Sequence, residues 1–393
     1  MAPAPTHWDL AVVGAGPAGA AAAVGALRAD ARLRVALLDR ADFPRDKACG
    51  DGVAPHVLDL LAEVGVSGLV DDRVPVERLR LGRGGLTVER RMDRPAWVVP
   101  RRVLDARLVD AAIAAGARLL RHRVRELRQH TDAVVLDDEI SAAVVVGADG
   151  AHSAVRRALG RPRGPVGLAL RGYAPVAPGR RGAQVIEFDT CHLPAYAWSF
   201  DRGDGHANVG YGELLRADRR APTRGQLLER LDALLPGAAG NGRDWVGHHL
   251  PFSTARRRPL TGRVLLAGDA AGLVNPLTGE GIYYAVATGI AAGRAAAAAL
   301  SAGRPQRAGE RHARTIRRIL LPHLRHTAVA ARLARSARII EAGLRASAAD
   351  QRVFDDLVEL GLARGRLTPT VALGLGRALV APAPPTDLTR EPA

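Results

Sequence analysis

Apolar residues follow two different periods along the chain, and the period changes twice. Up to about residue 162, short apolar runs such as 10–13 and 35–38 are separated by segments with helical spacing, which is typical of parallel strands buried between helices. This pattern predicts helices over 57–64 and 101–115, paired strands within 76–88, a strand over 118–120, a hairpin over 134–140 and a buried strand over 142–146.

The middle of the chain has a different pattern. Between residues 163 and 254, short strand-like segments at 184–188, 195–200 and 207–211 are separated by Gly or Asp turns, and a single helix is expected near 225–235. We therefore expect an inserted antiparallel sheet in this region.

The first pattern then returns, with a buried strand over 263–267 and a long helix over 281–300. Residues 309–377 have helical spacing and many arginines, and the Pro-rich residues 381–393 are expected to form a disordered tail. These changes assign residues 1–75, 96–162 and 255–303 to a discontinuous nucleotide-binding α/β domain, 76–95 and 163–254 to a substrate-binding β-sheet domain, and 304–380 to a helical region.

Residues 14–19, with the sequence GAGPAG, lie between the first predicted strand and the first predicted helix. Gly14 permits a tight turn, Gly16 lets the backbone approach a pyrophosphate, and Gly19 lets the helix close on the strand. Asp39 ends the next apolar run and is placed to bind a ribose hydroxyl. Strand, turn, helix, strand and acid follow in register, which favours a Rossmann-type dinucleotide site over a glycine-rich loop without a ligand.

Composition limits the class of protein. The 393 residues, 47% of them hydrophobic, suffice for two or three domains with a substantial core. Residues 1–7 lack the features of a signal peptide, and no run of about 18 apolar residues could span a bilayer, so we expect a cytoplasmic protein. Two cysteines, Cys49 and Cys191, cannot build a disulfide framework, and no Cys or His spacing resembles a metal site, so we expect no metal.

The net charge is +16, and all but one of the 56 basic residues are arginine. The arginines are scattered along the whole chain, which favours a compositional bias over a nucleic-acid site. An anionic membrane surface or an acidic substrate is the alternative, and it would place the protein peripherally on the inner face of the membrane. The oligomeric state is left open.

Three segments resemble the nucleotide fingerprints of the flavoprotein hydroxylase superfamily, which binds FAD: residues 14–19, the turn at Asp149 and Gly150, and the turn at Gly268 and Asp269. Within it, residues 47–52 (KACGDG), 194–200 (PAYAWSF) and 275–282 (NPLTGEGI) resemble the geranylgeranyl reductase family. The match spans about residues 8–300 and departs at Asp201, where that family usually has a proline. The resemblance implies an α/β fold with a discontinuous Rossmann-type FAD-binding domain, an inserted antiparallel β-sheet substrate domain and a C-terminal helical region.

The resemblance also implies how FAD is held. Asp269 would accept hydrogen bonds from the ribityl chain, and Arg101 resembles the family's FAD-contacting arginine, with Arg102 as a rival. The helix beginning near Gly281 would stabilise the anionic reduced flavin through its N-terminal charge, unless it is capped for stability alone. The other residues expected at the cofactor are Gly14, Gly16, Gly19, Asp39, Arg40, Lys47, Cys49, Gly50, Asp149, Gly268, Pro276, Gly279 and Ile282.

Three residues are candidates for catalysis. Cys49 lies in the loop 42–52, expected beside the flavin, where a protonated thiol could position or protonate a substrate; the alternative is a small buried hydrophobe. Tyr196 and Trp198 alternate on one predicted strand, so they share a face and could wall an apolar cavity, unless they are simply core aromatics. We interpret His152 as a surface residue.

We therefore expect an FAD-dependent oxidoreductase that reduces carbon–carbon double bonds of a prenylated or similar apolar substrate. Hydride would come from the reduced flavin, and the proton from Cys49, Tyr196 or water. Gly374 and Gly376 do not follow a strand, so no second dinucleotide fold is predicted, and NADPH or an external reductase would donate electrons transiently. A flavin monooxygenase or halogenase of an aromatic natural product, and a non-catalytic prenyl-lipid binding protein, remain the alternatives.

Overall fold

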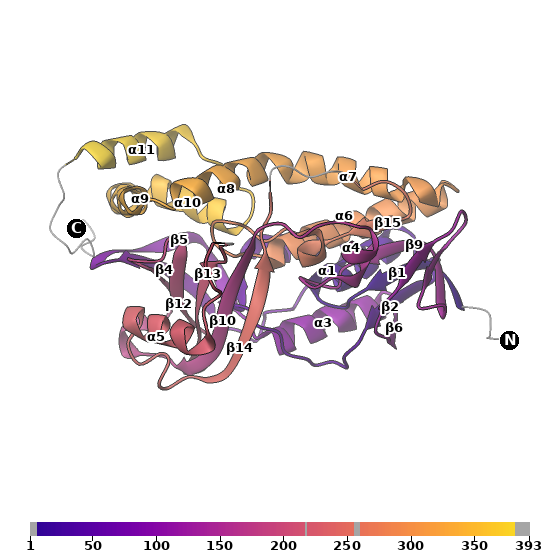
Figure 1. Ribbon diagram of the computed structural model, residues 1–393, viewed down its shortest axis with the longest axis horizontal. Helices are drawn as coiled ribbons and strands as arrows, with labels where there is room; N and C mark the ends of the chain where they lie inside the picture. Colours follow the sequence, from indigo (N-terminus) through magenta and orange to yellow (C-terminus); the bar gives the residue numbers. More distant parts are fainter. Residues whose placement is uncertain (1–5, 217, 255–259, 382–393) are drawn as a thin grey trace.

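A computed structural model describes residues 6–216, 218–254 and 260–381. The described residues form two sheets, and a layer of C-terminal helices lies along both of them (Figure 1). The predicted boundary at residue 255 and nearly all of the predicted tail lie outside the described residues. The division into domains stays a prediction.

Sheet A has the strand order β6-β2-β1-β9-β8-β7, and β15 pairs with β9. The five strands β6, β2, β1, β9 and β15 are parallel, whereas β8 and β7 are antiparallel to their neighbours. The strands are β1 (Thr6–Val13), β2 (Val35–Asp39), β6 (Arg118–Arg121), β7 (Leu127–Gln129), β8 (Val134–Leu136), β9 (Ile140–Gly147) and β15 (Val264–Leu266). Helices pack on one face of sheet A, and β7, β8 and α4 (Ala154–Ala158) pack on the other, which explains why the apolar residues of β2 and β15 are buried.

Two helices that are far apart in the sequence, α1 (Pro17–Ala29) and α6 (Ile282–Ser301), pack closely against each other beside sheet A. Gly289 and Gly293 of α6 face the backbone of Ala18 and Ala22 of α1, and a Cβ atom at Gly293 would lie 2.0 Å from the Ala22 carbonyl oxygen. The alanines and glycines of both helices therefore permit this close contact. Helices α2 (Pro55–Ala62) and α3 (Arg101–Ala114) also lie beside this sheet.

Sheet B has the order β14-β10-β13-β12-β11-β4-β5-β3 and is antiparallel except between β11 and β4. Its strands are β3 (Gly52–Val53), β4 (Pro75–Arg83), β5 (Leu86–Val98), β10 (Val166–Pro175), β11 (Ala183–Phe188), β12 (Ala195–Asp201), β13 (His206–Leu214) and β14 (Arg243–Pro251). Helix α5 (Arg224–Leu234) packs on the face that carries Ala183, Val185 and Ala197.

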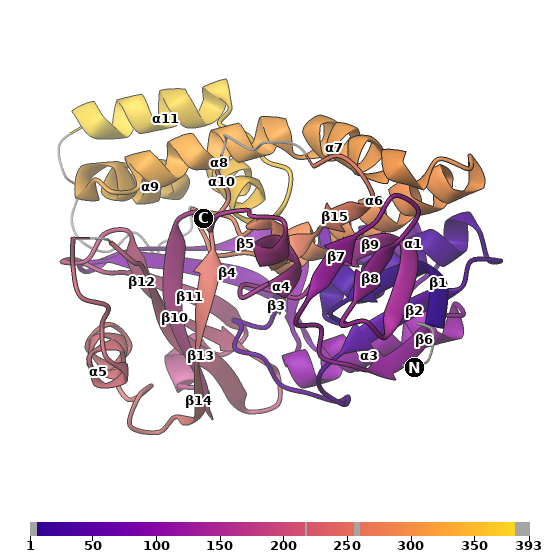
Figure 2. The ribbon, with the colours of Figure 1, turned by 45° about the vertical axis from the view of Figure 1, so that its right-hand side comes forward.

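Most of the C-terminal helices lie on the opposite face of sheet B from α5, as both ribbon views show (Figures 1 and 2). Those on this side of sheet B are α8 (Leu321–Leu333), α9 (Ala337–Ala349), α10 (Gln351–Leu362) and α11 (Pro369–Val380), whereas α7 (Ala308–Ile319) packs against α6 and β15 beside sheet A. Phe354 of α10 is fully buried against Leu79 and Met92. Arg90 of β5 donates to the carbonyl oxygen of Ser347 at 2.7 Å, which ties the end of α9 to the sheet.

Most predicted elements are present, with ends that differ by a few residues, except that β5 extends to Val98, well past the predicted end at residue 88. The predicted helices 57–64, 101–115, 225–235 and 281–300 correspond to α2, α3, α5 and α6. Strands β7, β10 and β14 were not predicted; β14 interrupts its apolar residues with His248 and His249, so no clear alternation marks it. Within the described ranges, no helix combines the length and apolarity needed to cross a bilayer.

Candidate active site

A continuous cavity of about 1870 Å³ extends from the glycine-rich turn after β1 to the C-terminal helices. Pockets for one small ligand usually measure about 300–1,000 Å³. The cavity therefore has room for a dinucleotide and a second molecule. It passes between sheet A, sheet B and the start of α6.

The glycine-rich turn has the geometry of a dinucleotide site. Gly14 has a φ of +97°, and a Cβ atom there would lie 2.4 Å from the Ala148 carbonyl oxygen, so only glycine fits. The Asp39 carboxylate at the end of β2 accepts a hydrogen bond of 2.9 Å from the Ala15 N–H. Helix α1 starts at Pro17 without a side-chain cap, which leaves its N-terminal N–H groups available to a phosphate.

Two arginines flank this turn. Arg101 of α3 is buried and forms two hydrogen bonds of 2.6 and 2.7 Å to Asp105. The Arg45 guanidinium lies 3.4 Å from both Asp39 and Asp105, and a Cβ atom on Gly16 would be 3.4 Å from it. These two cations, fixed beside an open helix N-terminus, suit a pyrophosphate.

The structure distinguishes the two arginines that the sequence left open. Arg101 lines the cavity, whereas Arg102 is exposed and is not among the lining residues. Arg45 was not predicted, although it lies in the loop that was expected beside the nucleotide. Arg40, which was predicted, is exposed at the edge of the cavity.

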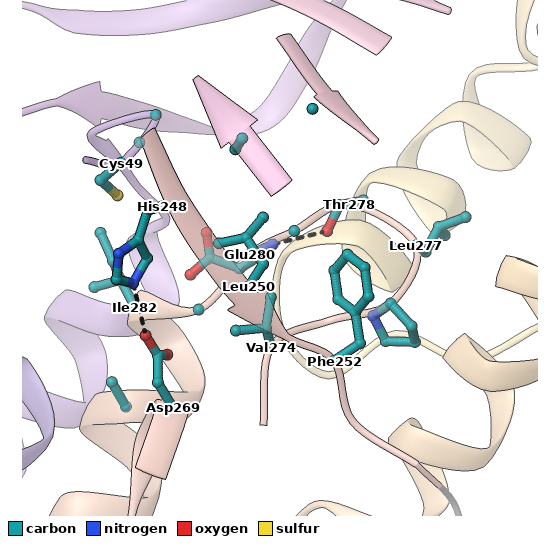
Figure 3. A pocket seen from close by; sticks show the side chains of 18 of the residues that line it. Cys49, His248, Leu250, Phe252, Asp269, Val274, Leu277, Thr278, Glu280 and Ile282 are labelled. Atoms are coloured by element: carbon teal, nitrogen blue, oxygen red, sulfur yellow. Dashed lines mark hydrogen bonds and ion pairs between the residues drawn. The ribbon is translucent and has the colours of Figure 1, made fainter. Parts of the chain in front are cut away.

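The Asp269 carboxylate lies just after β15, and Figure 3 shows it beside His248. Lys47 Nζ is 2.9 Å from Asp269 Oδ2, and His248 Nε2 is 4.0 Å from the same oxygen. Burial raises the pKa of Asp269, but Lys47 more than offsets it and holds the pKa below its ordinary value. Burial and Lys47 together lower the pKa of His248 to about 4, so this imidazole is neutral at pH 7. No sequence signal marked His248.

The loop before α6 is fixed by the C-terminal helices. The Asn275 side-chain amide donates to the carbonyl oxygens of Leu360 and Gly361, and the Thr278 hydroxyl donates to Gly361 at 2.8 Å. Tyr196 donates its hydroxyl proton to the Thr278 carbonyl oxygen. The loop therefore presents Pro276, Gly279, Glu280, Gly281 and Ile282 to the cavity.

The loop that carries Cys49 is held by Asn208 of β13. The Asn208 amide donates to the Cys49 carbonyl oxygen and to Asp51 Oδ2, both at 2.8 Å, and accepts a 2.7 Å hydrogen bond from the Trp198 indole. Tyr173 also donates to Asp51 Oδ2 at 2.7 Å. Asp51 is fully buried, and burial raises its pKa to about 6.

The three catalytic candidates meet at the cavity. Cys49, Tyr196 and Trp198 all line it, beside Gly50. Burial raises the pKa of the Cys49 thiol, so it is protonated at neutral pH. Burial also raises the pKa of Tyr196, whose hydroxyl donates a hydrogen bond to the Thr278 carbonyl oxygen. Its proton is therefore directed at Thr278 and not at the cavity.

Three predicted cofactor residues, Asp149, Gly19 and Gly268, stabilise the local fold around the site. Asp149 lines the cavity, but its carboxylate accepts hydrogen bonds from Ser153 Oγ at 2.5 Å and the Ala154 N–H at 2.6 Å. Gly19 and Gly268 are absent from the lining: a Cβ on Gly19 would collide with Gly14, and the Gly268 N–H donates to Thr288.

Beyond Tyr196 and Trp198 the cavity becomes an apolar channel between sheet B and the C-terminal helices. Its walls come from β4, β5 and β11 on one side and from α8 to α11 on the other, and include Leu79, Leu81, Met92, Ile186, Ile340, Leu344, Leu357, Val358 and Leu375. The sequence did not predict that the C-terminal helices reach the site.

Comparison with known proteins agrees with this geometry. The FAD binding domain family matches residues 7–179. Menaquinone reductase of Mycolicibacterium smegmatis is 38% identical over 313 residues, covering 72% of this chain and 75% of that protein. Digeranylgeranylglycerophospholipid reductase 1 of Methanopyrus kandleri is 33% identical over 317 residues, covering 75% of this chain and 81% of that protein.

The fold is shared with a solved structure. A geranylgeranyl bacteriochlorophyll reductase-like protein from Thermoplasma acidophilum superposes with a TM-score of 0.73, covers 97% of each chain and is 20% identical. The two reductases named above are 33–38% identical to this chain over more than two thirds of each protein. This similarity supports a reductase activity more than a monooxygenase or halogenase activity. The chain therefore belongs to the geranylgeranyl reductase family of FAD-dependent oxidoreductases.

Proposed function

We propose that this enzyme reduces a carbon–carbon double bond in the prenyl chain of an apolar substrate. One observation carries the proposal: the cleft that fits a dinucleotide opens, at Cys49 and Trp198, into an apolar channel. A long hydrocarbon chain in that channel would place one double bond beside the reactive edge of the cofactor. Transfer of the apolar prenyl chain from water into this channel is favourable, because the walls of the channel are apolar.

The residues of the cleft fit FAD. Arg45, Arg101 and the start of α1 would hold its pyrophosphate, and Asp39 its ribose. Asp269 and Lys47 would contact the ribityl chain, and the start of α6 would face the pyrimidine edge. When bound, FAD supplies the hydride of the reaction. NADPH or a separate reductase would supply the electrons.

The substrate class follows from the channel and from the named relatives, which act on a menaquinone and on a digeranylgeranyl phospholipid. Both classes of molecule carry prenyl chains on a polar head. We propose a prenylated quinone or a prenyl lipid, with its polar head at the far end of the channel.

Such substrates reside in membranes, and we propose that the enzyme docks on an anionic bilayer through α8 and α11. These helices expose Val329, Leu333, Leu373 and Val380, with Leu373 62% and Val380 87% exposed. Arg325, Arg332 and Arg335 lie beside them in the sequence, and arginines attract lipid phosphates.

The test uses chemically reduced, FAD-loaded enzyme under strict anaerobiosis and a menaquinone with four prenyl units as the probe. We expect a product with two more hydrogen atoms in its prenyl chain and flavin reoxidation in step. If only the quinone ring gains hydrogen, and loses it again in air, the enzyme reduces the ring and the proposal is wrong. A requirement for oxygen, with oxygen or halogen in the product, would replace it with the monooxygenase or halogenase.

Two variants separate binding from chemistry. Asp269→Ala should yield mostly FAD-free protein, because the ribityl contact is lost. Cys49→Ala should keep its FAD but reduce the double bond more slowly, by about tenfold or more, if the thiol helps to deliver the proton. A colourless wild-type protein that binds the probe would favour a prenyl-lipid binding protein without catalysis.

A further inference from the structure

Glu280 is a carboxylic acid at the meeting point of the cleft and the channel. It lies between Gly279 and Gly281, immediately before α6, and lines the cavity. Its Oε1 accepts a hydrogen bond of 2.8 Å from the Tyr283 N–H at the start of that helix. In Figure 3 the carboxyl group points to the side of the cavity where Cys49 and His248 lie.

The titratable groups close enough to act on Glu280 electrostatically come from five segments of the chain. They are Cys49 of the loop before β3, Arg101 of α3, Tyr196 of β12, Asp269 at the end of β15 and Tyr284 of α6. Arg101 is the cation of this set, and Asp105 holds it in two hydrogen bonds. Lys47 is bound to Asp269, and His248 is neutral, so neither is free to neutralise Glu280.

The surroundings of Glu280 bring its pKa close to neutral pH. Burial is the main effect and, with Asp269, raises the pKa of Glu280 to about 7, although the Tyr283 and Ile282 N–H groups and Arg101 act in the other direction. A carboxyl group with this pKa exchanges its proton near neutral pH, as an efficient general acid must. Tyr196 is poorly suited, because its hydroxyl group already donates a hydrogen bond to the Thr278 carbonyl oxygen.

We propose that Glu280 carries the proton of the reaction: it takes up a proton when negative charge develops on the reduced cofactor beside it, and gives that proton to the substrate. This inference rests on the proposed function and names its acid. The π bond of the alkene breaks; one carbon accepts the hydride that the cofactor supplies, and the other takes the proton of Glu280, directly or through the Cys49 thiol. Glu280 is left as a carboxylate, and it takes up a proton from water again when NADPH or a separate reductase next reduces the cofactor.

The matched variants are Glu280→Gln and Glu187→Gln. Glutamine keeps an acceptor for the Tyr283 N–H but cannot titrate. Glu187 of β11 is also a half-buried carboxyl whose pKa desolvation raises to about 7, but its side chain lies over Gly82 and does not line the cavity. It therefore controls for the loss of a half-buried carboxyl with a similarly raised pKa that lies away from the cavity.

The first measurement is the flavin midpoint potential against pH in FAD-loaded protein without substrate. Above about pH 7, where Glu280 ionises before reduction, one extra proton per two electrons adds about 30 mV per pH unit to the wild-type slope. We expect Glu187→Gln to keep this extra slope and Glu280→Gln to lose it. Reduced-minus-oxidised infrared spectra should show a new protonated carboxyl band in the wild type and in Glu187→Gln alone.

An unchanged slope and an unchanged carboxyl band in Glu280→Gln would overturn the proposal. With the menaquinone probe, we expect Glu280→Gln to reduce the double bond about 100-fold more slowly than the wild type, with FAD retained. Full turnover in that variant would also overturn it. If the slope and band behave as expected but the wild type reduces no double bond, the proposed function fails while proton uptake by Glu280 stands.

Discussion

Lys47 Nζ lies 2.9 Å from Asp269 Oδ2, so the one lysine of the sequence is bound to the acidic residue at the end of β15. The two residues are 222 positions apart. The pair joins the loop that carries Cys49 to the turn after β15, which leads into the loop before α6. It is a contact that cofactor binding would have to share or replace.

The pair predicts a pH-dependent stability. Because Lys47 holds the folded-state pKa of Asp269 below its ordinary value of 3.8, the stabilisation is present at neutral pH and is lost as the pH falls through that lowered pKa. Lys47→Met should destabilise FAD-free protein by about 1–3 kcal/mol at neutral pH, since Asp269 is left buried without its partner. The deficit should shrink in acid, where Asp269 is protonated. Thermal unfolding at both pH values measures this, with Lys47→Arg as the control; an equal deficit at both would contradict it.

Asn208 is expected to position Cys49. Asn208→Ala removes the donor to the Cys49 carbonyl oxygen and to Asp51, so we expect a loss of about 1–3 kcal/mol in unfolding free energy. Turnover should fall while FAD absorbance is retained, because Asn208 is remote from the glycine-rich turn. Asn241→Ala, at an exposed asparagine in the turn after α5, is the control. Wild-type turnover in Asn208→Ala would show that the loop needs no such support.

The contact between α1 and α6 predicts an intolerance of larger residues. Gly293→Ala would place a methyl group 2.0 Å from the Ala22 carbonyl oxygen, so overpacking should cost roughly 1–3 kcal/mol. A Cβ atom on Gly376 of α11 would meet no atom of another described segment within 4 Å, so Gly376→Ala should be neutral or stabilising by up to about 1 kcal/mol. Denaturant unfolding of the two variants compares them. Equal effects would contradict close packing of these helices.

The channel predicts a dependence on chain length. Gly343 of α9 lines the channel, and its nearest neighbour is Leu375 at 3.9 Å from a Cβ atom, so a large side chain can be accommodated there. Gly343→Phe should raise the KM for the four-unit menaquinone about tenfold or more, equivalent to about 1.4 kcal/mol. A probe with a single prenyl unit should be unaffected, and Gly343→Ala is the control. A similar loss for both probes would place the long chain elsewhere.

The proposed membrane contact predicts binding that depends on charge. Co-sedimentation with vesicles should rise with their content of anionic lipid and fall with salt, because screening weakens the attraction. The double variant Arg332→Glu, Arg335→Glu should lower binding. Arg219→Glu, Arg220→Glu, in the exposed loop before α5, should not. Equal binding to neutral and anionic vesicles would leave the arginines as a compositional bias.

The sequence by itself determined the local structure of the nucleotide-binding turns and the positions of most helices and strands. Gly14, Gly19 and Asp39 encode a strand, a tight turn and a helix start, because backbone conformation and close approach limit which residues fit there. The same holds for the Asp269 turn. Apolar periodicity also located most helices and strands, since burial of one face is a property of each segment.

Only the tertiary structure decided which distant residues share the site. Arg45 and His248 reach the cavity, and Asn208 reaches the loop that carries Cys49, through loop geometry and strand register. No local pattern reports a register between strands far apart in the chain. The role of the C-terminal helices could not be predicted either. The apolar stripe of an amphipathic helix shows that one face is buried, but it does not identify the surface that covers this face. Packing of α8 to α11 over sheet B makes that face the wall of a channel. It also fixes the loop that carries Glu280 through Asn275 and Thr278, so the position of this acid depends on contacts that the sequence order does not contain.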